Sequence, residues 1–386
     1  MSATDIKVAA GTRGNDCDMR IGIDVRPLSY QLTGIGVYLK YLLEEIQRKD
    51  HINHYYLFSN APINFDLKNP KWSKIEGRLE RKLISTLWIQ FRVPLIVSRL
   101  SIDLFWSPRH HLPLFLPPRV KTVLTVHDLV HRVYPGTMAL PNLLAERLFM
   151  RWSLLRSDCV IAISRSTVLG IQNFYGVCPD KIDTIYPGIP AFPTNSGDDV
   201  DRNRTLPSKY FLFVGTLDPR KNLDRLFKAF ELINPQNHGV HLVIVGATGW
   251  KSKALHRMIE MHPLKHHVHF PGYVPRDKLA TYYKKALCLI FPSLYEGFGF
   301  PIIEAMSCGT PVITSNTSSM PEVAGDAALL VDPYSVNALA KAMYDVMNSK
   351  NLRKHLAIKG FERIALFSWE CCAAETIRVF KRTVKK

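Results

Sequence analysis

Short apolar runs rich in β-branched and aromatic residues alternate with longer amphipathic stretches along most of the chain. Runs that are apolar at consecutive positions are typical of strands buried on both faces of a parallel sheet. Their alternation with helical patterns predicts an α/β fold built on doubly wound parallel sheets. The predicted strands are residues 20–27, 54–59, 102–108, 122–128, 158–164, 210–216, 240–246, 287–293 and 310–316.

These runs fall into two groups, separated by the stretch PGIPAFPTNSGDDVDRNRTLPSKY. Three prolines followed by polar and charged residues are typical of a linker between domains. A chain of 386 residues is also long for one core. The predicted organisation is a disordered leader (1–18), a first Rossmann-like domain (19–187), a linker (188–208), a second Rossmann-like domain (209–365) and a C-terminal amphipathic helix (366–386) returning to the first domain. Met19 is an alternative start, because the first predicted strand follows it directly.

Composition narrows the classes of protein to consider. A hydrophobic content of 47% with 22% charged residues is ordinary for a soluble globular protein. No run of about 18 apolar residues predicts a membrane-spanning helix, and the first residues lack the apolar block of a secretory signal. The seven cysteines show no CxxC spacing, which favours a reducing, cytoplasmic compartment and argues against a zinc site.

The balance of 50 basic against 33 acidic residues gives a net charge of +17 and predicts an anionic partner. A nucleotide, a phospholipid surface and a nucleic acid all fit that charge. The basic residues are spread along the chain and form no recognised nucleic-acid-binding motif, so we do not expect nucleic acid as the partner.

Ligands of open parallel sheets bind beyond the carboxyl ends of the strands. The stretch VGTLDPRKN places Gly215, Thr216, Arg220 and Lys221 at such an end. Two cations there could neutralise a diphosphate. The alternative is a solvated basic turn before a helix.

The stretch EGFGFPIIEAMSCG follows another predicted strand. Gly297 and Gly299 allow backbone to approach a ligand, and Pro301 suits the first turn of a helix, whose free N–H groups attract phosphate. Glu304 would then lie about one turn inside that helix, within reach of ribose hydroxyls, while Glu296 could reach a sugar. The alternative is a glycine-rich connection with two exposed acids.

The first half of the chain offers weaker candidates. His127 and Asp128 follow the strand 122–128, where a histidine could donate to a phosphate or to a sugar hydroxyl, or simply hold the loop. Gly34 and Gly36 precede an amphipathic helix but lack the GxGxxG spacing of a dinucleotide fingerprint, which disfavours a nicotinamide dehydrogenase. His131 is expected to lie on the surface.

Together these motifs resemble the retaining glycosyltransferases of family 4, which have the GT-B fold of two Rossmann-like domains facing a cleft. The resemblance spans residues 19–386 and rests on Glu296 and Glu304 as an E-x7-E motif, on VGTLDPRKN and on PEVAGDAALLVDP (321–333). It implies that Glu304 holds the ribose of a sugar nucleotide and that Glu296 binds the donor sugar. The backbone around Phe298, Gly299 and Phe300 would meet the sugar or the phosphate.

The resemblance also implies roles for the remaining candidates. Lys221 matches the family's diphosphate lysine, and His127 matches a histidine near the anomeric carbon. Gly36, with Gly34, matches a loop that closes over the phosphates. Many members have an arginine after the strand-end glycine; here that position is Thr216, and Arg220 is expected to supply the cation.

The likeness is greatest to bacterial O-antigen and exopolysaccharide mannosyltransferases, which implies mannose transfer from GDP-mannose to a saccharide or lipid-linked saccharide. No cofactor is expected, since the sugar nucleotide is a substrate, and no metal is expected, since no DxD-type motif stands at the end of a predicted strand. Family resemblance favours front-face attack over a covalent intermediate. A UDP-sugar or deoxysugar donor, or a sugar-nucleotide epimerase of the same fold, remains an alternative.

Two basic, apolar segments could account for part of the positive charge. Residues 81–100 combine four cations with apolar residues and Trp88, a composition that suits either an anionic membrane surface on the cytoplasmic side or a core-facing helix. Residues 147–156 are similar, and we expect them to belong to the core.

Overall fold

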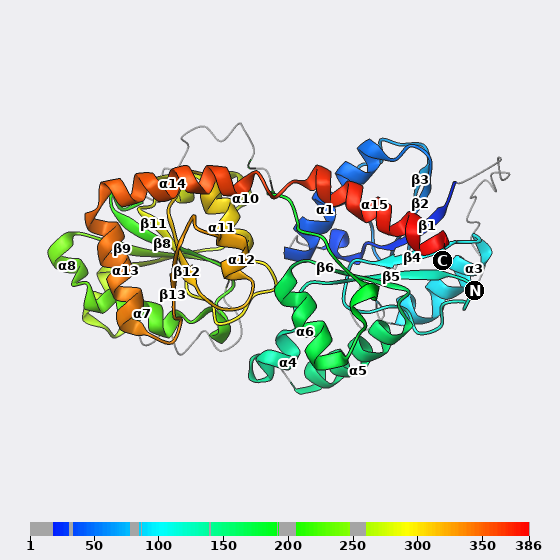
Figure 1. Cartoon of the computed structure of the whole chain (residues 1–386), viewed down its shortest axis with the longest axis horizontal. Helices are drawn as coiled ribbons and strands as arrows, with labels where there is room; N and C mark the ends of the chain where they lie inside the picture. Colours follow the sequence, from blue (N-terminus) through cyan, green and yellow to red (C-terminus); the bar gives the residue numbers. More distant parts are fainter. Residues whose placement is uncertain are drawn as a thin grey trace.

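Two α/β domains lie side by side in the computed structural model, which describes residues 18–30, 34–77, 85, 87–138, 140–190, 192, 206–247 and 260–385 (Figure 1). Within those residues, every strand pairing in both sheets is parallel. Most of the predicted leader and linker lies outside the described residues.

The N-terminal sheet has the strand order β3-β2-β1-β4-β5-β6-β7 over the described part of the chain. Its strands are β1 (Arg20–Asp24), β2 (His54–Ser59), β3 (Trp72–Glu76), β4 (Leu104–Ser107), β5 (Lys121–Val126), β6 (Cys159–Ala162) and β7 (Ile182–Thr184). Its helices are α1 (Gly34–Lys49), α3 (Val93–Arg99), α4 (Val130–Val133), α5 (Leu140–Arg156) and α6 (Arg165–Tyr175).

The C-terminal sheet has the order β10-β9-β8-β11-β12-β13 over the same described part. Its strands are β8 (Tyr210–Val214), β9 (His241–Val245), β10 (Val268–Gly272), β11 (Cys288–Phe291), β12 (Val312–Ser315) and β13 (Leu329–Val331). Its helices are α7 (Leu223–Leu232), α8 (Pro235–His238), α10 (Arg276–Lys285), α11 (Phe300–Ser307), α12 (Met320–Ala324), α13 (Val336–Asn348) and α14 (Lys350–Ile364).

All nine predicted runs contain a strand, and the four described strands without a predicted run, β3, β7, β10 and β13, are edge strands. An edge strand is less buried, so its sequence lacks the continuous apolar run on which the prediction rested. The β3 sequence WSKIE is half polar, and the β10 sequence VHFPG contains a proline, which sheets tolerate at an edge.

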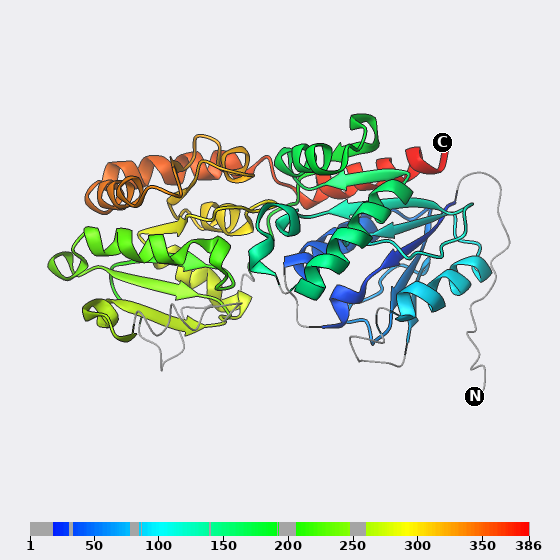
Figure 2. The same ribbon diagram turned by 90° about the horizontal axis from the view of Figure 1, so that it is seen from below.

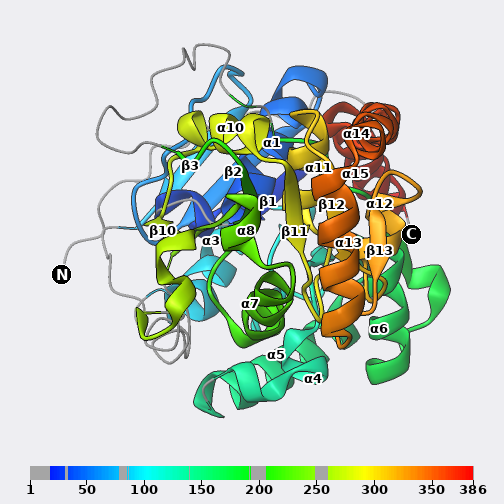
Figure 3. The ribbon, with the colours of Figure 1, turned by 90° about the vertical axis from the view of Figure 1, so that its left-hand side faces the viewer.

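Alternate residues of the N-terminal strands enter two separate cores, one on each face of the sheet. On β4, Trp106 packs against Phe380 with ring centroids 5.3 Å apart, whereas Phe105 enters the core beneath α3 and α5. Phe380 belongs to α15 (Trp369–Lys385), which follows α14 of the C-terminal domain and returns to lie beside α1 (Figures 1 and 3). The C-terminal helix therefore completes the core of the N-terminal domain.

Among the described residues, no helix is both long and apolar enough to cross a membrane.

Candidate active site

A cavity of about 480 Å³ lies between the two domains, at the carboxyl ends of β5, β8 and β11. The N-terminal domain contributes Gly34, His127 and Asp128 to its lining. All of the other candidates line it as well, except Gly36: Gly215, Thr216, Arg220, Lys221, Glu296, Gly297, Phe298, Gly299, Phe300 and Glu304. Residues that are up to 270 positions apart in the sequence therefore surround one space.

The first-domain glycines differ from the expectation. Gly34 and Gly36 form the first turn of α1 and do not belong to a loop before it. Gly34 is exposed beside the cavity, while Gly36 is buried inside the helix. The helix begins at Gly34, about one turn before Val37, the residue at which the apolar pattern that predicted it starts.

A charge cluster stands at the centre of the cavity wall. The Glu296 carboxylate accepts from Lys221 Nζ at 2.5 Å through Oε1 and from Arg220 Nη1 at 2.8 Å through Oε2. The three side chains are between 7% and 19% exposed, so water screens them little. Burial alone would raise the pKa of Glu296, but Lys221 and Arg220 lower it to about 2.

Burial lowers the pKa of Lys221, and Glu296 opposes that shift. The cluster as a whole carries two positive charges against one negative, which leaves one net positive charge for a ligand. Both oxygens of Glu296 are engaged with cations, so its role in this structure is to orient Lys221 and Arg220. A direct contact of Glu296 with the donor sugar remains a prediction.

The loop from Glu296 to Gly299 is held by hydroxyl groups of the following segment. Ser319 Oγ lies within hydrogen-bond distance of the carbonyls of Glu296 and Phe298, and Ser318 Oγ donates to the Glu296 carbonyl. Gly299 has a φ of +117°, a backbone conformation that favours glycine, and it immediately precedes α11. Free N–H groups at the start of α11 consequently border the cavity.

Glu304 lies on α11 and has two partners that the sequence analysis missed. Its Oε1 accepts from Arg276 Nη1 at 2.9 Å, and its Oε2 accepts from the Tyr283 hydroxyl at 2.9 Å. Arg276 also donates to the carbonyl of Pro190 at 2.7 Å, which ties α10 to the chain crossing between the domains. An ionised carboxylate has about four lone-pair sites, so Glu304 retains acceptor capacity for ribose hydroxyls.

Arg276 was missed because β10, which precedes it, was missed. The sequence HFPGYVPRDK does carry a signal, since an arginine that follows a strand-end glycine resembles the arrangement at Arg220. Without β10, nothing in the sequence placed this arginine at the carboxyl edge of the sheet.

His127 is buried and its pKa is lowered to about 4, first by burial and then by the neighbouring His110. Its Nε2 lies 2.8 Å from the Pro108 carbonyl oxygen, which can only accept, so Nε2 carries the proton. Neutral His127 is left with Nδ1 as an acceptor, which suits a sugar hydroxyl and not the donation to phosphate considered above. Its ring also contacts Tyr38 edge-to-face, with centroids 4.9 Å apart.

A second cavity, of about 320 Å³, shares Asp128 and Arg220 with the first. Its wall includes Glu146 of α5, whose carboxylate pairs with His110 at 3.0 Å. His131 lines this cavity and is 1% exposed, with its ring bonded to the Tyr175 hydroxyl. The expectation that His131 lies on the surface was therefore wrong: α4 turns it inward.

Several contacts join the domains around the two cavities. The Tyr295 hydroxyl accepts from the N–H of Leu129 at 3.0 Å. Glu322 of α12 accepts from the N–H groups of Arg165 and Ser166 at 2.8 and 3.0 Å, at the N-terminus of α6, where the helix dipole favours a carboxylate. The structure thus holds the cleft in a closed arrangement.

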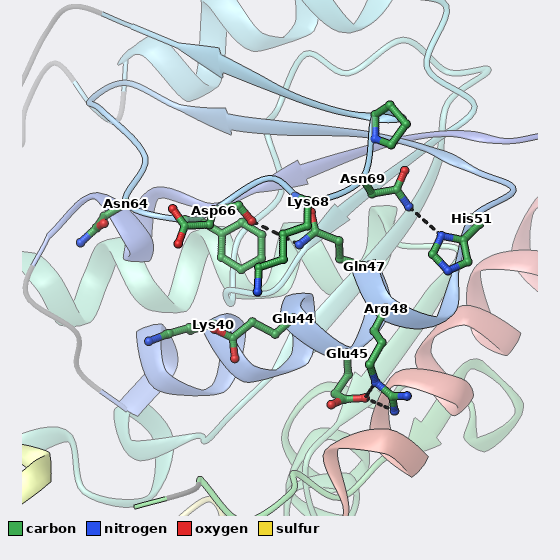
Figure 4. Close-up of a pocket in the computed structure, with 12 residues that line it drawn as sticks. Lys40, Glu44, Glu45, Gln47, Arg48, His51, Asn64, Asp66, Lys68 and Asn69 are labelled. Atoms are coloured by element: carbon green, nitrogen blue, oxygen red, sulfur yellow. Dashed lines mark hydrogen bonds and ion pairs between the residues drawn. The ribbon is translucent and has the colours of Figure 1, made fainter. Parts of the chain in front are cut away.

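A third cavity, of about 800 Å³, lies between α1 and residues 64–70 (Figure 4). Several polar side chains there bond to one another or to backbone; Gln47, for example, joins Asp66 and Lys68. Its lining contains none of the motif residues, so we do not place the donor site there.

The comparisons with known proteins agree with this geometry. Residues 198–363 match the family described as "Glycosyl transferases group 1", and residues 32–191 match "Glycosyltransferase Family 4". The chain is 29% identical to O-antigen chain mannosyltransferase B of Escherichia coli, over 94% of this chain and 100% of that protein. It is 30% identical to O-antigen chain mannosyltransferase RfbU of Salmonella typhimurium, over 65% of this chain and 66% of that one.

Among solved structures, sucrose-phosphate synthase of Thermosynechococcus elongatus superposes with a TM-score of 0.72 at 20% identity, covering 95% of this chain and 99% of that one. The two facing parallel-sheet domains are the GT-B fold. The chain belongs to the family 4 glycosyltransferases and resembles the O-antigen mannosyltransferases among them.

Proposed function

We propose that this glycosyltransferase moves mannose from GDP-mannose to a saccharide or lipid-linked saccharide in the synthesis of a cell-surface polysaccharide, with retention of anomeric configuration. The observation that carries the proposal is the Lys221–Glu296–Arg220 cluster. It lies beyond the carboxyl end of β8 and lines the same cavity as the start of α11. Mannose as the sugar is supported by the names of the relatives, which act on the O-antigen chain.

The leaving diphosphate would bind where positive charge is concentrated. Breaking the bond between sugar and phosphate develops negative charge on the leaving group, and preorganised cations are worth most in a site that excludes water. Lys221 and Arg220 are fixed by Glu296 before the donor arrives, so little reorganisation is needed during the reaction. Two side-chain cations and the N–H groups of α11 would supply this stabilisation without a metal ion.

The nucleoside would lie over α11, with its ribose hydroxyls donating to Glu304. Arg276, which also lines the cavity, and Tyr283 hold that carboxylate. His127, neutral and closing the other wall, would accept from a hydroxyl of the donor sugar. These assignments place the anomeric carbon between the domains, next to Asp128 and the second cavity.

The second cavity is the natural place for the acceptor hydroxyl. It shares Asp128 and Arg220 with the donor cavity, and carboxylates such as Glu146 are good acceptors for sugar hydroxyls. We propose front-face attack, in which the leaving phosphate takes the acceptor proton. A donor made in the cytoplasm implies a cytoplasmic location for the enzyme.

A screen of GDP- and UDP-sugars by thermal stabilisation tests the donor, because a ligand that binds only the native state raises the unfolding temperature. GDP-mannose should give the largest shift. An equal or larger shift with a UDP-sugar would overturn the choice of donor, and no shift with any sugar nucleotide would overturn the function. Incubating the donor with and without acceptor separates a transferase from an epimerase, which needs no acceptor.

A further inference from the structure

The two basic, apolar segments predicted from the sequence are each buried in part. Trp88 of the first segment belongs to the core, as a core-facing helix requires. The second segment, residues 147–156, was expected to belong to the core, which is wrong for Leu148, since that side chain is 72% exposed. Residues 81–84 and 86 of the first segment lie outside the described residues. Between the two segments in the sequence stands another cation, Arg109, which is half-buried.

Each sheet has a switch point, where the strand order along the sheet changes direction. In the C-terminal sheet it lies between β8 and β11, and the donor cluster of Arg220, Lys221 and Glu296 follows these two strands. In the N-terminal sheet it lies between β1 and β4 (Figures 1 and 2). Open α/β sheets bind ligands beyond the carboxyl ends of their strands at such a point. The N-terminal domain therefore has a candidate ligand position of its own, beyond β1 and β4.

The side chains at this second switch point are again one acid and two cations. Asp24 is the last residue of β1, Arg26 follows it two positions later, and Arg109 comes two positions after the end of β4. Ile23 of β1 lies opposite Trp106 of β4 in the sheet register. The acid and both arginines therefore leave adjacent strands at the same edge of the sheet.

The acid of this group is already bonded through both of its oxygens. Arg26 donates to Asp24 from Nε at 2.8 Å and from Nη2 at 2.7 Å, one bond to each oxygen. Burial alone would raise the pKa of Asp24, but Arg26 first, and Arg109 after it, lower that pKa. The Asp24–Arg26 pair is neutral as a unit, so it leaves the charge of Arg109 uncompensated.

The second acid that attracts Arg109 is engaged as well. Glu146 lies with its carboxylate 3.0 Å from His110 Nδ1 and 3.1 Å from His111 Nε2. Within the described part of the chain, the Arg109 guanidinium has no hydrogen bond and no ion pair of its own. Burial lowers the pKa of Arg109, and Asp24 opposes that shift. A half-buried cation with five N–H donors and no bonded acceptor carries a desolvation cost that an anionic ligand would offset.

Arg109 lies next to both cavities of the cleft. The pKa of His127 is lowered first by burial and then by His110, and the charge of Arg109 lowers it further, which places the guanidinium near that wall of the donor cavity. His110, the residue after Arg109, lines the second cavity. Ser107 Oγ lies 3.1 Å from the Arg109 carbonyl oxygen, so the loop that carries both residues is fixed to the end of β4.

We propose that Arg109 forms a second oxyanion site, which binds a phosphate or carboxylate group carried by the acceptor. A guanidinium presents its N–H donors as a planar fork that matches either anion in two places. An acceptor can present a hydroxyl to the second cavity and its anionic group to Arg109, because His110 and Arg109 are consecutive. The acceptor as the source of the anion rests on the function proposed above, whereas the position of the uncompensated cation does not.

Calorimetric titration of the GDP-saturated protein tests the site without any transfer, because GDP fills the donor cavity first. Methyl phosphate and acetate are the probes, one for each kind of oxyanion. At least one of them should bind the wild type, and Arg109→Gln should weaken that binding at least tenfold, since it removes a charged hydrogen-bond donor. Arg151→Gln is the matched control, an exposed arginine on α5 of the same domain, and should leave the binding unchanged.

Two further measurements separate a binding arginine from a structural one. Arg109→Lys should keep part of the affinity, because the charge remains without the planar fork. Arg109→Gln should not lower the unfolding temperature, because no hydrogen bond is lost. A lower unfolding temperature with unchanged anion binding would overturn the proposal. Wild type that binds neither probe, equal losses in Arg109→Gln and Arg151→Gln, or at least tenfold weaker GDP binding by Arg109→Gln would overturn it too.

Transfer kinetics test the acceptor as the source of the anion. Methyl mannoside, 2-phosphoethyl mannoside and 2-carboxyethyl mannoside share one sugar and differ in charge. With GDP-mannose, the acceptor whose anion binds in the calorimetry should have a KM at least tenfold below that of methyl mannoside, and Arg109→Gln should abolish the difference. Equal KM values in the wild type would overturn the acceptor role. If no acceptor is glycosylated, the proposed function fails, and the calorimetry still decides whether Arg109 binds an oxyanion.

Discussion

Gly297 of the C-terminal domain lies so close to His127 of the N-terminal domain that a Cβ at position 297 would fall 1.8 Å from the His127 carbonyl oxygen. No side chain fits there while the domains stay closed. Glycine is therefore required at position 297, because the backbones of the two domains approach each other there. Both residues line the donor cavity. This contact makes closure sensitive to one methyl group.

Gly297→Ala should lower turnover with little loss of folding stability. Opening the cleft relieves the clash, but closure is what excludes water and completes the site. We expect kcat to fall roughly tenfold or more, which corresponds to a rise of about 1.4 kcal/mol or more in the free energy of reaching the transition state in the closed enzyme. Steady-state kinetics with a thermal melt measures both. Gly136→Ala, where a Cβ meets open space, is the control, and unchanged kinetics at position 297 would contradict the closed arrangement as the active one.

Glu304→Gln should weaken nucleotide binding more than it lowers turnover. The amide keeps the shape of the side chain but loses the charged acceptor, and a hydrogen bond to a charged group contributes about 1.5–3 kcal/mol, or roughly 10- to 100-fold in Kd. Isothermal titration with GDP gives the Kd directly. Glu362→Gln, on the exposed side of α14, should leave it unchanged. An unaltered Kd for the Glu304 variant would refute the ribose assignment.

Glu296→Gln should lower kcat and change the pH dependence of stability. The pKa of Glu296 is about 2 in the folded state, below its ordinary 4.5, so its contribution is complete above about pH 4.5 and is lost as pH falls toward 2. The shift corresponds to a stabilisation on the order of 3 kcal/mol at neutral pH. Urea unfolding of both proteins between pH 3 and 7 should show a gap that narrows on acidification. A constant gap would contradict the ion-pair origin.

His127 should stay neutral, protonated on Nε2, throughout the pH range of activity. Its pKa of about 4 is below the ordinary 6.5, so its neutral form favours folding fully above pH 6.5 and progressively less as pH falls toward 4. Nitrogen-15 NMR of the imidazole resolves both the tautomer and the pKa. A titration near pH 6.5, or a proton on Nδ1, would refute the proposed acceptor role.

Much of the fold follows from local pattern. Buried parallel strands such as 210–216 and 287–293 need unbroken apolar runs because both faces are covered, and every such run contains a strand. The edge strands β3, β7, β10 and β13 have no such run for the same reason, since burial does not constrain their sequence as strongly. Local chemistry also predicted the turn at Gly299 and the place of Pro301 in the first turn of a helix, which begins at Phe300.

The sequence by itself determined the two-sheet architecture, the family and the candidate residues at strand ends, because each depends on residues near one another in the chain. Tertiary structure alone decided that Glu296 pairs with Lys221 and Arg220, that Arg276 supports Glu304, and that Leu148 faces solvent. Those relationships depend on which elements pack together and on which side of a helix remains uncovered. Periodicity along one segment shows which residues share a side, but not which other element packs against that side.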